Sequence, residues 1–237
     1  MYKRILLKLS GESLGDIEKG RSFSPESADY IATEIAAASS AAPQTQIGIV
    51  IGGGNIWRGA RATGIPVDRV SADGMGMLAT IINAMALRGA LESKGVKTKV
   101  LTAVNVYPVA EYYSARKAME YLKAGNIVIF AGGTGSPFFT TDTGASLRAA
   151  EIGAEIIFKA TQVDGVYSAD PKKYPDAEKY DTLSYSEALS KGLKIMDASA
   201  LSMCLDNKIS TLVFNLHIPG NIRNAVTGQQ TGTIIKP

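Results

Sequence analysis

The sequence predicts an α/β protein of three layers, in which helices cover both faces of a central, mostly parallel sheet. First, short apolar runs alternate with helix-forming stretches along the chain, which favours a parallel sheet joined by helical crossovers. Second, these runs are continuously apolar, as in strands buried on both faces. Third, the 237 residues contain no internal repeat, linker or low-complexity tail, so we expect one domain over residues 1–237.

Apolar runs define the expected strands. In chain order they are Arg4 to Leu9, Ile47 to Ile51, Thr98 to Leu101, Asn126 to Ala131, Glu155 to Lys159 and Thr211 to Asn215. The second and fourth of these run directly into Gly52 and Gly132. Loops at the carboxyl ends of parallel strands form the ligand sites of open α/β sheets, so we expect ligand-binding turns at both places.

Helix-forming stretches, most of them opened by a capping residue, separate these strands. The first begins at Ser24, which precedes Pro25, and ends near Pro43. The next covers a Met-, Leu-, Ile- and Ala-rich stretch from about Val70 to Ser93, and another runs from Ser114 to near Gly125. The last three begin at Thr140 or Thr141, ending at Gly153; at Ser184, which forms a capping box with Glu187; and at Asp197, continuing through Leu205.

Four glycine-marked turns stand out, and three of them contain a lysine, an arginine or an aspartate. They are Lys8 to Gly11, Gly52 to Arg58, Gly132 to Gly135, and Lys159 to Gly165. Glycine lets backbone N–H groups approach a ligand closely, and successive N–H groups form an anion-binding nest. Nests with cations beside them predict a site for several phosphates.

Composition and charge exclude several other classes of function. The formal net charge is +3 and there is no long basic run, so we expect no nucleic-acid partner. A single cysteine leaves no disulfide framework or metal-ligand cluster and suits a reducing compartment. No run approaches the roughly 20 consecutive apolar residues of a membrane span. We therefore expect a soluble, cytoplasmic protein without a membrane partner.

Familiar nucleotide-binding and hydrolase motifs are absent from the sequence. The Gly52–Gly54 turn fails the dinucleotide pattern because Trp57 stands where the third glycine belongs, and no stretch fits a P-loop or a protein-kinase catalytic loop. The single histidine, His217, lies in a strand-to-helix loop, and we interpret it as a solvated side chain. Cys204 lies in an apolar helical pattern, and we interpret it as a core thiol.

The remaining candidates point to phosphoryl transfer, in which a protein chiefly positions reactants and neutralises charge. Lys8 and Lys159 lie at strand ends, so their ammonium groups could converge on the β- and γ-phosphates of ATP. Asp142, at a predicted helix start, could orient the lysines or hold Mg²⁺ through water. The alternative is that the lysines are surface charges and Asp142 a favourable charge at a helix N-terminus.

The Asp164-Gly165 dipeptide is a hairpin-turn signal and predicts a two-stranded arm. In this arm Tyr167 could stack on a nucleobase and Asp170 could accept a hydrogen bond from a ribose hydroxyl; an ordinary hairpin is the alternative. The segment from Asp170 to Asp181 is charged and holds two prolines, which predicts an exposed loop and a candidate mobile lid.

Five motifs together resemble those of the bacterial UMP kinase (uridylate kinase) family of the amino acid kinase superfamily. The resemblance runs from Lys3 to Ile235. It rests on KLSGE from Lys8, GGGNIWRG from Gly52, ADGMGM from Ala72, GGTGSPFFTTD from Gly132 and KATQVDGVYSADP from Lys159. Each motif is weak alone, but in this order they are highly specific.

The resemblance implies the amino acid kinase fold and transfer of the γ-phosphoryl group of ATP to UMP, giving ADP and UDP, with Mg²⁺ as cofactor. It implies a catalytic centre of Lys8, Asp142, Lys159 and Arg58. It implies ATP contacts at Lys8, Leu9, Ser10, Gly11, Gly54, Arg58, Thr161, Gln162, Tyr167 and Asp170. It implies UMP contacts at Gly53, Asp73, Thr134, Gly135, Ser136, Pro137, Phe138, Phe139, Thr140 and Thr141. It implies no direct metal ligand, self-association as a homohexamer, and regulation by GTP and UTP.

Two positions depart from the family pattern. The stretch from Gly15 to Arg21 is associated with effectors in the family and is commonly richer in glycine there than in this sequence, so the resemblance supports GTP activation only weakly. Ser13 stands where alanine is common, with no expected consequence.

Two rival functions remain open. Acetylglutamate, glutamate, aspartate and carbamate kinases share the architecture but phosphorylate carboxylates, and Asp73 with the loop from Thr134 to Thr141 argues against such acceptors. A non-catalytic nucleotide sensor belongs to another class, since a fold can bind ligands without turnover. The presence of Lys8, Asp142 and Lys159 argues against a sensor.

Overall fold

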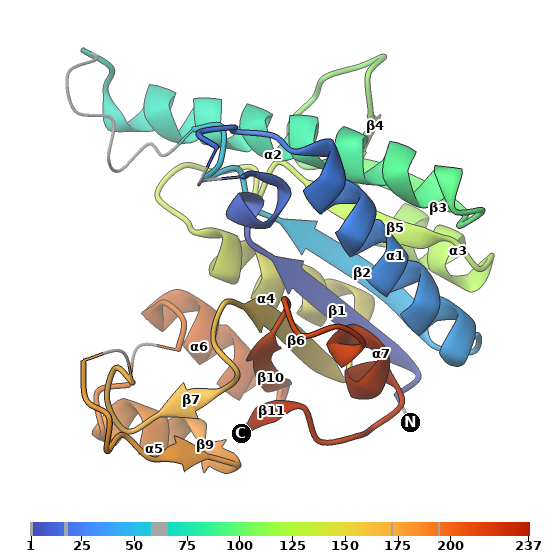
Figure 1. Cartoon of the computed structure of the whole chain (residues 1–237). Coiled ribbons are helices and arrows are strands. Elements are labelled where there is room, and N and C mark those ends of the chain that lie inside the picture. The colour runs from blue at the N-terminus through green and yellow to red at the C-terminus, as the bar shows by residue number, and fades with distance from the viewer. Residues whose placement is uncertain (1, 17–18, 58–65, 172, 194) are drawn as a thin grey trace.

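The computed structural model describes residues 2–16, 19–57, 66–171, 173–193 and 195–237 (Figure 1). Its strands are β1 (Arg4–Leu9), β2 (Gln46–Ile51), β3 (Thr98–Thr102), β4 (Glu111–Tyr112), β5 (Ile127–Ala131), β6 (Ile156–Thr161), β7 (Val166–Tyr167), β8 (Lys179–Tyr180), β9 (Thr182–Ser184), β10 (Ser210–Asn215) and β11 (Gly232–Lys236). Within these ranges one large sheet has the order β4-β3-β5-β2-β1-β6-β10-β11-β9, and β7 pairs with β8 outside it.

Six of the helices in the described ranges begin within a residue or two of their predicted starts, whereas η1 and α7 were not predicted. They are a short 3₁₀ helix η1 (Gly11–Leu14) and the α-helices α1 (Pro25–Ala41), α2 (Arg69–Ser93), α3 (Ala115–Lys123), α4 (Thr141–Ile152), α5 (Tyr185–Ser190), α6 (Ala198–Asp206) and α7 (Asn221–Val226). Ser24, Ser114, Thr140 and Asp197 each accept a hydrogen bond from a backbone N–H of the first turn, and the Ser184–Glu187 capping box is formed. The predicted caps are confirmed.

Two hydrophobic cores lie on opposite faces of the sheet, which confirms the three-layer α/β prediction (Figure 1). Helices α1, α2 and α7 cover one face, where they pack on the odd-numbered residues of β1. Helices α3, α4, α5 and α6 cover the other face, which includes Leu6. Successive side chains of a strand point to opposite faces, so Lys8 shares the α4 face with Leu6.

Parallel pairing brings the carboxyl ends of the central strands to one edge. β1 is parallel to both β2 and β6, β2 to β5, and β6 to β10, whereas β10 and β11 are antiparallel. The loops after these parallel strands therefore meet, as expected for a ligand site in an open α/β sheet.

The predicted two-stranded arm is present, but its pairing differs from the expected tight hairpin at Asp164-Gly165. Val166–Tyr167 pairs antiparallel with Lys179–Tyr180, so the arm is closed by the intervening segment, and β8 lies inside the segment expected to be only an exposed loop. The turn signal at Gly165 instead places the backbone beside β11, where the N–H of Val166 donates to the Thr233 hydroxyl over 2.8 Å.

Helix α2 meets the length and hydropathy criteria of a membrane span, with 39% of its most apolar window buried in the fold. It is the long helix across the top of Figure 1. Its buried residues include Ile81, Ala84, Leu87 and Leu91, which pack in the core against the sheet. A core helix satisfies the same criteria, so length and hydropathy do not separate the two roles here.

Candidate active site

Lys8, Lys159 and Asp142 form a compact charged centre at the carboxyl ends of β1 and β6. Lys8 and Lys159 are register partners on these parallel strands, so both side chains point to the α4 face. The Nζ atoms lie 2.9 Å from Asp142 Oδ1 and 2.6 Å from Asp142 Oδ2, respectively. Asp142 stands in the first turn of α4. One carboxylate therefore bridges two ammonium groups, as predicted from their positions at strand ends.

Burial and charge oppose each other in this centre. Burial would raise the pKa of the Asp142 carboxyl, but the charges of Lys8 and Lys159 outweigh it and hold that pKa below its ordinary value. Burial lowers the pKa of the Lys159 ammonium, and Asp142 offsets only part of this effect. Lys159 also donates to the backbone carbonyl of Ile195.

The two first glycine turns pack directly against each other beside this centre. The N–H of Gly52 donates to the Leu9 carbonyl over 3.1 Å. A Cβ on Gly11 would lie 2.6 Å from the Gly52 carbonyl oxygen and 2.8 Å from the Gly54 nitrogen. Since a Cβ does not fit between these backbones, glycine is required by close approach at Gly11.

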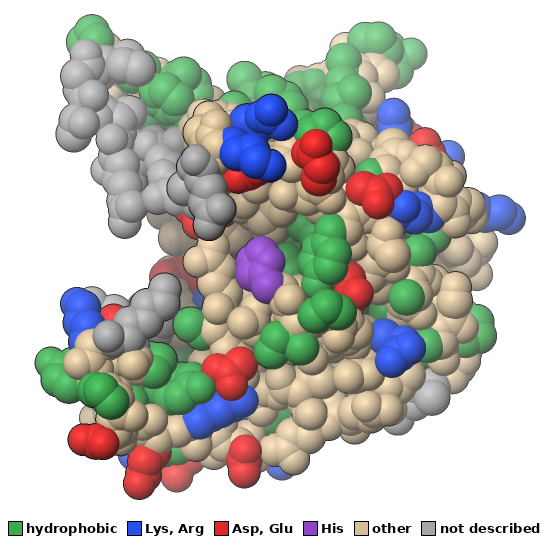
Figure 2. Space-filling view, in the orientation of Figure 1, with side chains coloured by type: hydrophobic (Ala, Val, Ile, Leu, Met, Phe, Trp, Pro, Cys, Tyr) green, Lys and Arg blue, Asp and Glu red, His purple; other side chains and the backbone are tan. Residues whose placement is uncertain are grey.

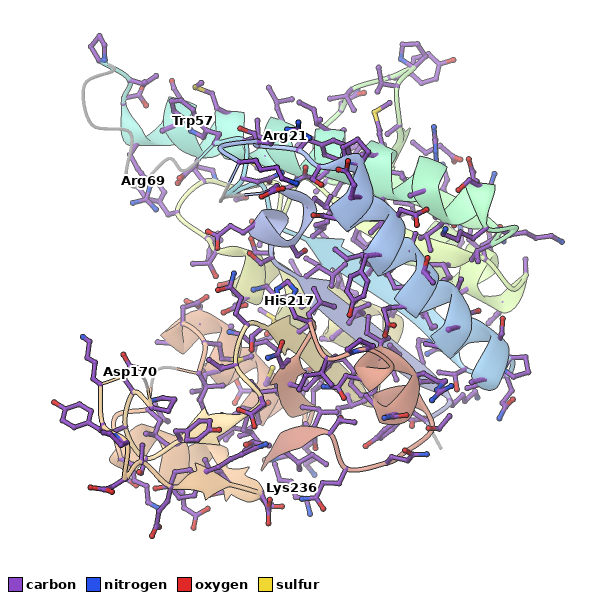
Figure 3. The ribbon with its side chains drawn as sticks, viewed as in Figure 1. Arg21, Trp57, Arg69, Asp170, His217 and Lys236 are labelled. Carbon is purple, nitrogen blue, oxygen red and sulfur yellow. The ribbon has the colours of Figure 1, made fainter. Side chains whose placement is uncertain are left out.

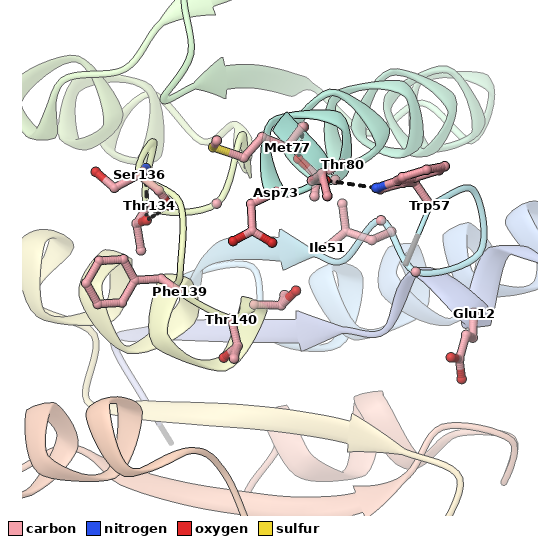
Figure 4. A pocket seen from close by; sticks show the side chains of 16 residues that line it. Glu12, Ile51, Trp57, Asp73, Met77, Thr80, Thr134, Ser136, Phe139 and Thr140 are labelled. Carbon is pink, nitrogen blue, oxygen red and sulfur yellow. Dashed lines mark hydrogen bonds between the residues drawn. The ribbon is translucent and has the colours of Figure 1, made fainter. Parts of the chain in front are cut away.

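A cavity of about 610 Å³ opens beyond the Gly52–Gly54 turn (Figure 4). Its lining residues come from four segments that are distant in sequence, and they include Gly53, Gly54, Trp57, Asp73, Thr80, Gly133, Thr134, Ser136, Phe139, Thr140 and Thr141. Its size lies in the range of small-molecule sites. Figure 4 shows the Asp73 carboxylate pointing from α2 toward the Thr134–Thr140 loop.

That loop is attached to α2 through Asp73. The backbone N–H of Phe138 donates to Asp73 Oδ2 over 2.8 Å, and Arg69 Nε donates to the same oxygen over 2.8 Å. Phe138 has a φ of +73°, which is uncommon for a residue with a side chain. The hydrogen bond to Asp73 thus fixes a strained turn at the mouth of the cavity.

The glycine turn after β5 is held from two sides by side chains. The N–H of Gly132 donates to the Thr80 hydroxyl over 2.7 Å. The Gly133 carbonyl accepts from Arg148 Nη2 over 3.2 Å. Arg148 is 4% exposed and stacks over the Tyr113 ring at 4.0 Å. The turn that lines the cavity is therefore rigidly supported.

A second cavity, of about 560 Å³, lies on the other side of Lys159 between the β7–β8 arm and the segment before α6. Tyr167, Asp170 and Thr161 line it together with the apolar residues Val163, Val166, Leu193, Ile195 and Val213. Polar groups at the rim of an apolar floor suit a nucleoside, whose base is flat and whose ribose carries hydroxyls.

Asp197, which directly precedes α6, links the second cavity to the start of α4. Asp197 caps α6 by accepting from the N–H of Ala200 over 3.0 Å, and it also accepts from the hydroxyls of Thr140 and Thr143 at the start of α4. The helix start that carries Asp142 is therefore fixed to the wall of the second cavity.

The structure places most of the predicted site residues around these cavities. Gly54, expected on the ATP side, lines the same cavity as Gly53. The side chain of Leu9 is fully buried in the core, so only its backbone faces the turn. Gly135, Pro137 and Phe138 are not among the residues lining the large cavity. Arg58 lies outside the described residues.

Several supporting residues escaped the sequence analysis. Asn83 is fully buried; it donates to the Gly52 carbonyl over 2.7 Å and lies within hydrogen-bond distance of the Asn55 amide. Thr80 and Asn83 stand three residues apart in the otherwise apolar α2 stretch, and residues three apart share a helix face. Polar residues at that spacing on a buried face were the available signal.

The charged centre fits a divalent cation that is coordinated mainly by the phosphates of a bound nucleotide. The described residues contain no group of three His, Cys, Asp or Glu side chains able to hold a metal ion. Asp142 Oδ1 is buried and makes no hydrogen bond to a described group, although Lys8 Nζ lies 2.9 Å away. Mg²⁺ usually keeps several waters and binds through one or two carboxylates plus phosphates, which agrees with this donor set.

Comparison with known proteins agrees with this geometry. A model of the amino acid kinase family matches residues 3–215. The chain superposes on the UMP kinase from Bacillus anthracis with a TM-score of 0.95 and 41% identity, covering 99% of this chain and 96% of that one. The UMP kinase from Ureaplasma parvum gives a TM-score of 0.93 and 38% identity, with 100% of both chains covered. The uridylate kinase from Archaeoglobus fulgidus gives a TM-score of 0.73 and 33% identity, with 98% of this chain and 99% of that one covered.

Proposed function

The chain belongs to the amino acid kinase family, and on this premise we propose that it is a UMP kinase, which transfers the γ-phosphoryl group of ATP to UMP and releases ADP and UDP. The observation that carries the proposal is the Lys8–Asp142–Lys159 centre, which stands between two cavities of nucleotide size. The Bacillus anthracis and Ureaplasma parvum structures of the same fold are UMP kinases, which supports UMP as the acceptor.

The chemistry requires positive charge rather than a base. A phosphate monoester has a second pKa of about 6, so the UMP phosphate is already a nucleophilic dianion at neutral pH. The difficulty is repulsion between two anions. Lys8 and Lys159 reduce it and stabilise the charge on the transferring group, and the N-terminus of α4 adds positive potential at Thr141 and Asp142. Mg²⁺ would neutralise the β- and γ-phosphates, with Asp142 Oδ1 within reach through water.

The two cavities divide the substrates. The 610 Å³ cavity would take UMP, with Asp73 accepting from the ribose hydroxyls and the Thr134–Thr141 loop enclosing the monophosphate. The 560 Å³ cavity would take adenosine, with Tyr167 and Asp170 at its rim. The triphosphate would run from Thr161 to the Lys8–Gly11 turn. Arg58 is proposed to assist catalysis on the basis of the resemblance alone.

Self-association is part of the proposal. Val70, Leu78 and Ile82 on α2 are each at least half exposed, and such an apolar stripe is typical of a protein–protein interface. A homohexamer in the cytoplasm, with GTP and UTP as candidate effectors, follows from the resemblance. These features are separable from the catalytic proposal.

The experiment is an ADP-release assay with ATP, Mg²⁺ and a panel of acceptors. We expect UMP to be the preferred acceptor over CMP, AMP, acetylglutamate and carbamate, and chelation of Mg²⁺ to abolish turnover. Asp73→Asn should raise the KM for UMP at least 10-fold while changing the KM for ATP little, because it weakens the contacts to the ribose and releases the Phe138 turn.

The rival functions give different results in the same assay. Preference for a carboxylate acceptor would identify an amino acid kinase and reject UMP as substrate. Calorimetric binding of ATP and UMP without formation of ADP or UDP would identify a nucleotide sensor and reject the proposal.

A further inference from the structure

A small cavity of about 190 Å³ lies between the segment from Lys8 to Ser13, the end of β6 and the loop after β10. It shares Glu12 with the 610 Å³ cavity and Thr161 with the 560 Å³ cavity. Its lining also includes Lys8, Ser10 and Gln162 from the predicted site, and Leu216 and His217 from the loop after β10. His217 therefore lines the same cavity as the predicted phosphate ligands Lys8 and Ser10.

The loop that carries His217 is held in place by hydrogen bonds from neighbouring elements. The N–H of His217 donates to the Asn215 side chain over 2.8 Å. Tyr30 on α1 donates to the Leu216 carbonyl over 3.1 Å, and Glu34 accepts from the N–H of Gly220 over 2.8 Å. Figure 3 shows the His217 side chain near the carboxyl end of β1, and Figure 2 shows the imidazole at the surface beside the open hollow.

The charged groups around His217 come from four neighbouring elements. Lys8 and Glu12 face the cavity from β1 and η1, and Lys8 is in contact with Asp142. From α1, the Glu34 carboxylate is bound to the loop backbone; from α7, Arg223 Nη2 lies within 3.7 Å of a Cβ placed on Gly220. A bound triphosphate would bring several negative charges beside these groups. In the proposed function Lys8 and Lys159 face its β- and γ-phosphates, so a protonated His217 would add a further positive charge.

We propose that His217 is a further ligand of ATP, whose protonated imidazole donates a hydrogen bond to a non-bridging oxygen of the triphosphate. The inference rests on the proposed function and extends it by one residue. Histidine changes charge between about pH 5 and 8, and hydrogen bonds from a charged donor to phosphate are roughly twice as strong as neutral ones. ATP should therefore bind more tightly as the pH falls through this range.

The test uses the fact that His217 is the single histidine of the chain, so NMR of the untagged protein reports on one imidazole. We expect the pH midpoint of the imidazole titration to rise when ATP with Mg²⁺ is bound and to stay in place with adenosine or with UMP. An unchanged midpoint in saturating ATP would overturn the inference, as would an equal rise with UMP.

Kinetics supply an independent readout. At pH 6 the KM for ATP of His217→Asn and of His217→Gln should rise about 3- to 10-fold. This rise in KM should exceed any fall in kcat. At pH 8 both variants should match the unmodified protein within about twofold. The titration of ATP itself is common to all the proteins and cancels in the comparison. Ile218→Asn, which alters an exposed neighbour outside the cavity, is the matched control.

The two proposals fail in different ways. If the unmodified protein binds ATP but forms no UDP, the proposed function fails while the NMR titration still decides the role of His217. If UDP forms and the His217 variants keep their KM for ATP at pH 6, only the inference about His217 is overturned.

Discussion

Lys8 and Lys159 are register partners on adjacent parallel strands, and the same carboxylate, that of Asp142, lies within 3 Å of both ammonium groups. Two like charges at neighbouring sheet positions would repel each other in a partly buried place. Asp142 offsets this repulsion and holds both amines at the carboxyl ends of β1 and β6. The sheet register therefore creates the charged centre that we propose to be catalytic.

Loss of either amine should reduce turnover strongly. We predict that Lys8→Met and Lys159→Met each lower kcat by roughly 10²-fold or more, the effect of removing one oriented charge stabiliser. Lys236→Met, at an exposed lysine on β11 far from the site, should leave kcat unchanged. Steady-state rates with saturating ATP and UMP measure this, and near-normal turnover in either site variant would contradict the assignment.

Asp142→Asn should reduce stability as well as turnover. The variant leaves two ammonium groups without their shared counter-charge, and we expect the free energy of unfolding to fall by about 2 to 3 kcal/mol at pH 7. Urea unfolding monitored by circular dichroism measures this change. A variant as stable as the unmodified protein at pH 7 would show that the carboxylate does not bind the lysines in solution.

The pH dependence of this stability difference follows from the lowered pKa of Asp142. Its stabilising contribution is complete above the unfolded pKa of about 3.9 and is lost as the pH falls through the lower folded value. The difference between the unmodified protein and Asp142→Asn should therefore be constant from pH 7 to about pH 5 and shrink below about pH 4. Urea unfolding series at these pH values measure it, and a difference that grows on acidification would contradict the assigned direction.

Thr80→Val should loosen the glycine turn after β5. The hydroxyl accepts from the N–H of Gly132 over 2.7 Å and donates to the Met77 carbonyl over 2.7 Å. Valine keeps the shape but leaves the buried N–H unpaired, at a cost of about 1 to 2 kcal/mol. We expect the KM for UMP to rise several-fold while the KM for ATP stays within twofold. Equal changes in both KM values would indicate a general loss of structure instead.

The exposed stripe on α2 should mediate self-association. We predict that Leu78→Asp and Ile82→Asp each shift the protein to smaller species in sedimentation velocity, because an aspartate buried at an apolar interface lacks a partner. Leu189→Asp, at a residue of α5 that is 57% exposed, is the matched control and should leave the assembly unchanged. Unaltered sedimentation of the α2 variants would place the interface elsewhere.

Local patterns in the sequence predicted most of the fold. β1 has the predicted bounds, the other predicted strands differ by one or two residues at an end, and the caps at Ser24, Ser114 and Asp197 are formed. These features depend on residues close together in the chain. The missed elements are η1, β4, β8, β9, β11 and α7, which are at most six residues long. Their stability comes from neighbouring elements rather than from their own periodicity.

The candidate site was predictable only in part for the same reason. Strand ends and glycine turns identified Lys8, Lys159 and the turns around them, since parallel strands bring their carboxyl ends together. The supporting contacts of Arg148 with Gly133 and of Asn83 with Gly52 join residues 15 and 31 positions apart. No spacing rule connects such pairs, because the contact depends on how helices pack on the sheet.

The hydrogen bond between Phe138 and Asp73 also bears on how a nucleotide would enter. This bond docks the loop on α2 through groups of the chain itself, so much of the loop's conformational freedom is given up during folding. An incoming acceptor then needs to order little protein, which favours rapid capture and a small entropic penalty on association. Binding in this cavity would mainly change the hydrogen-bond partners of Asp73 and would order little additional backbone.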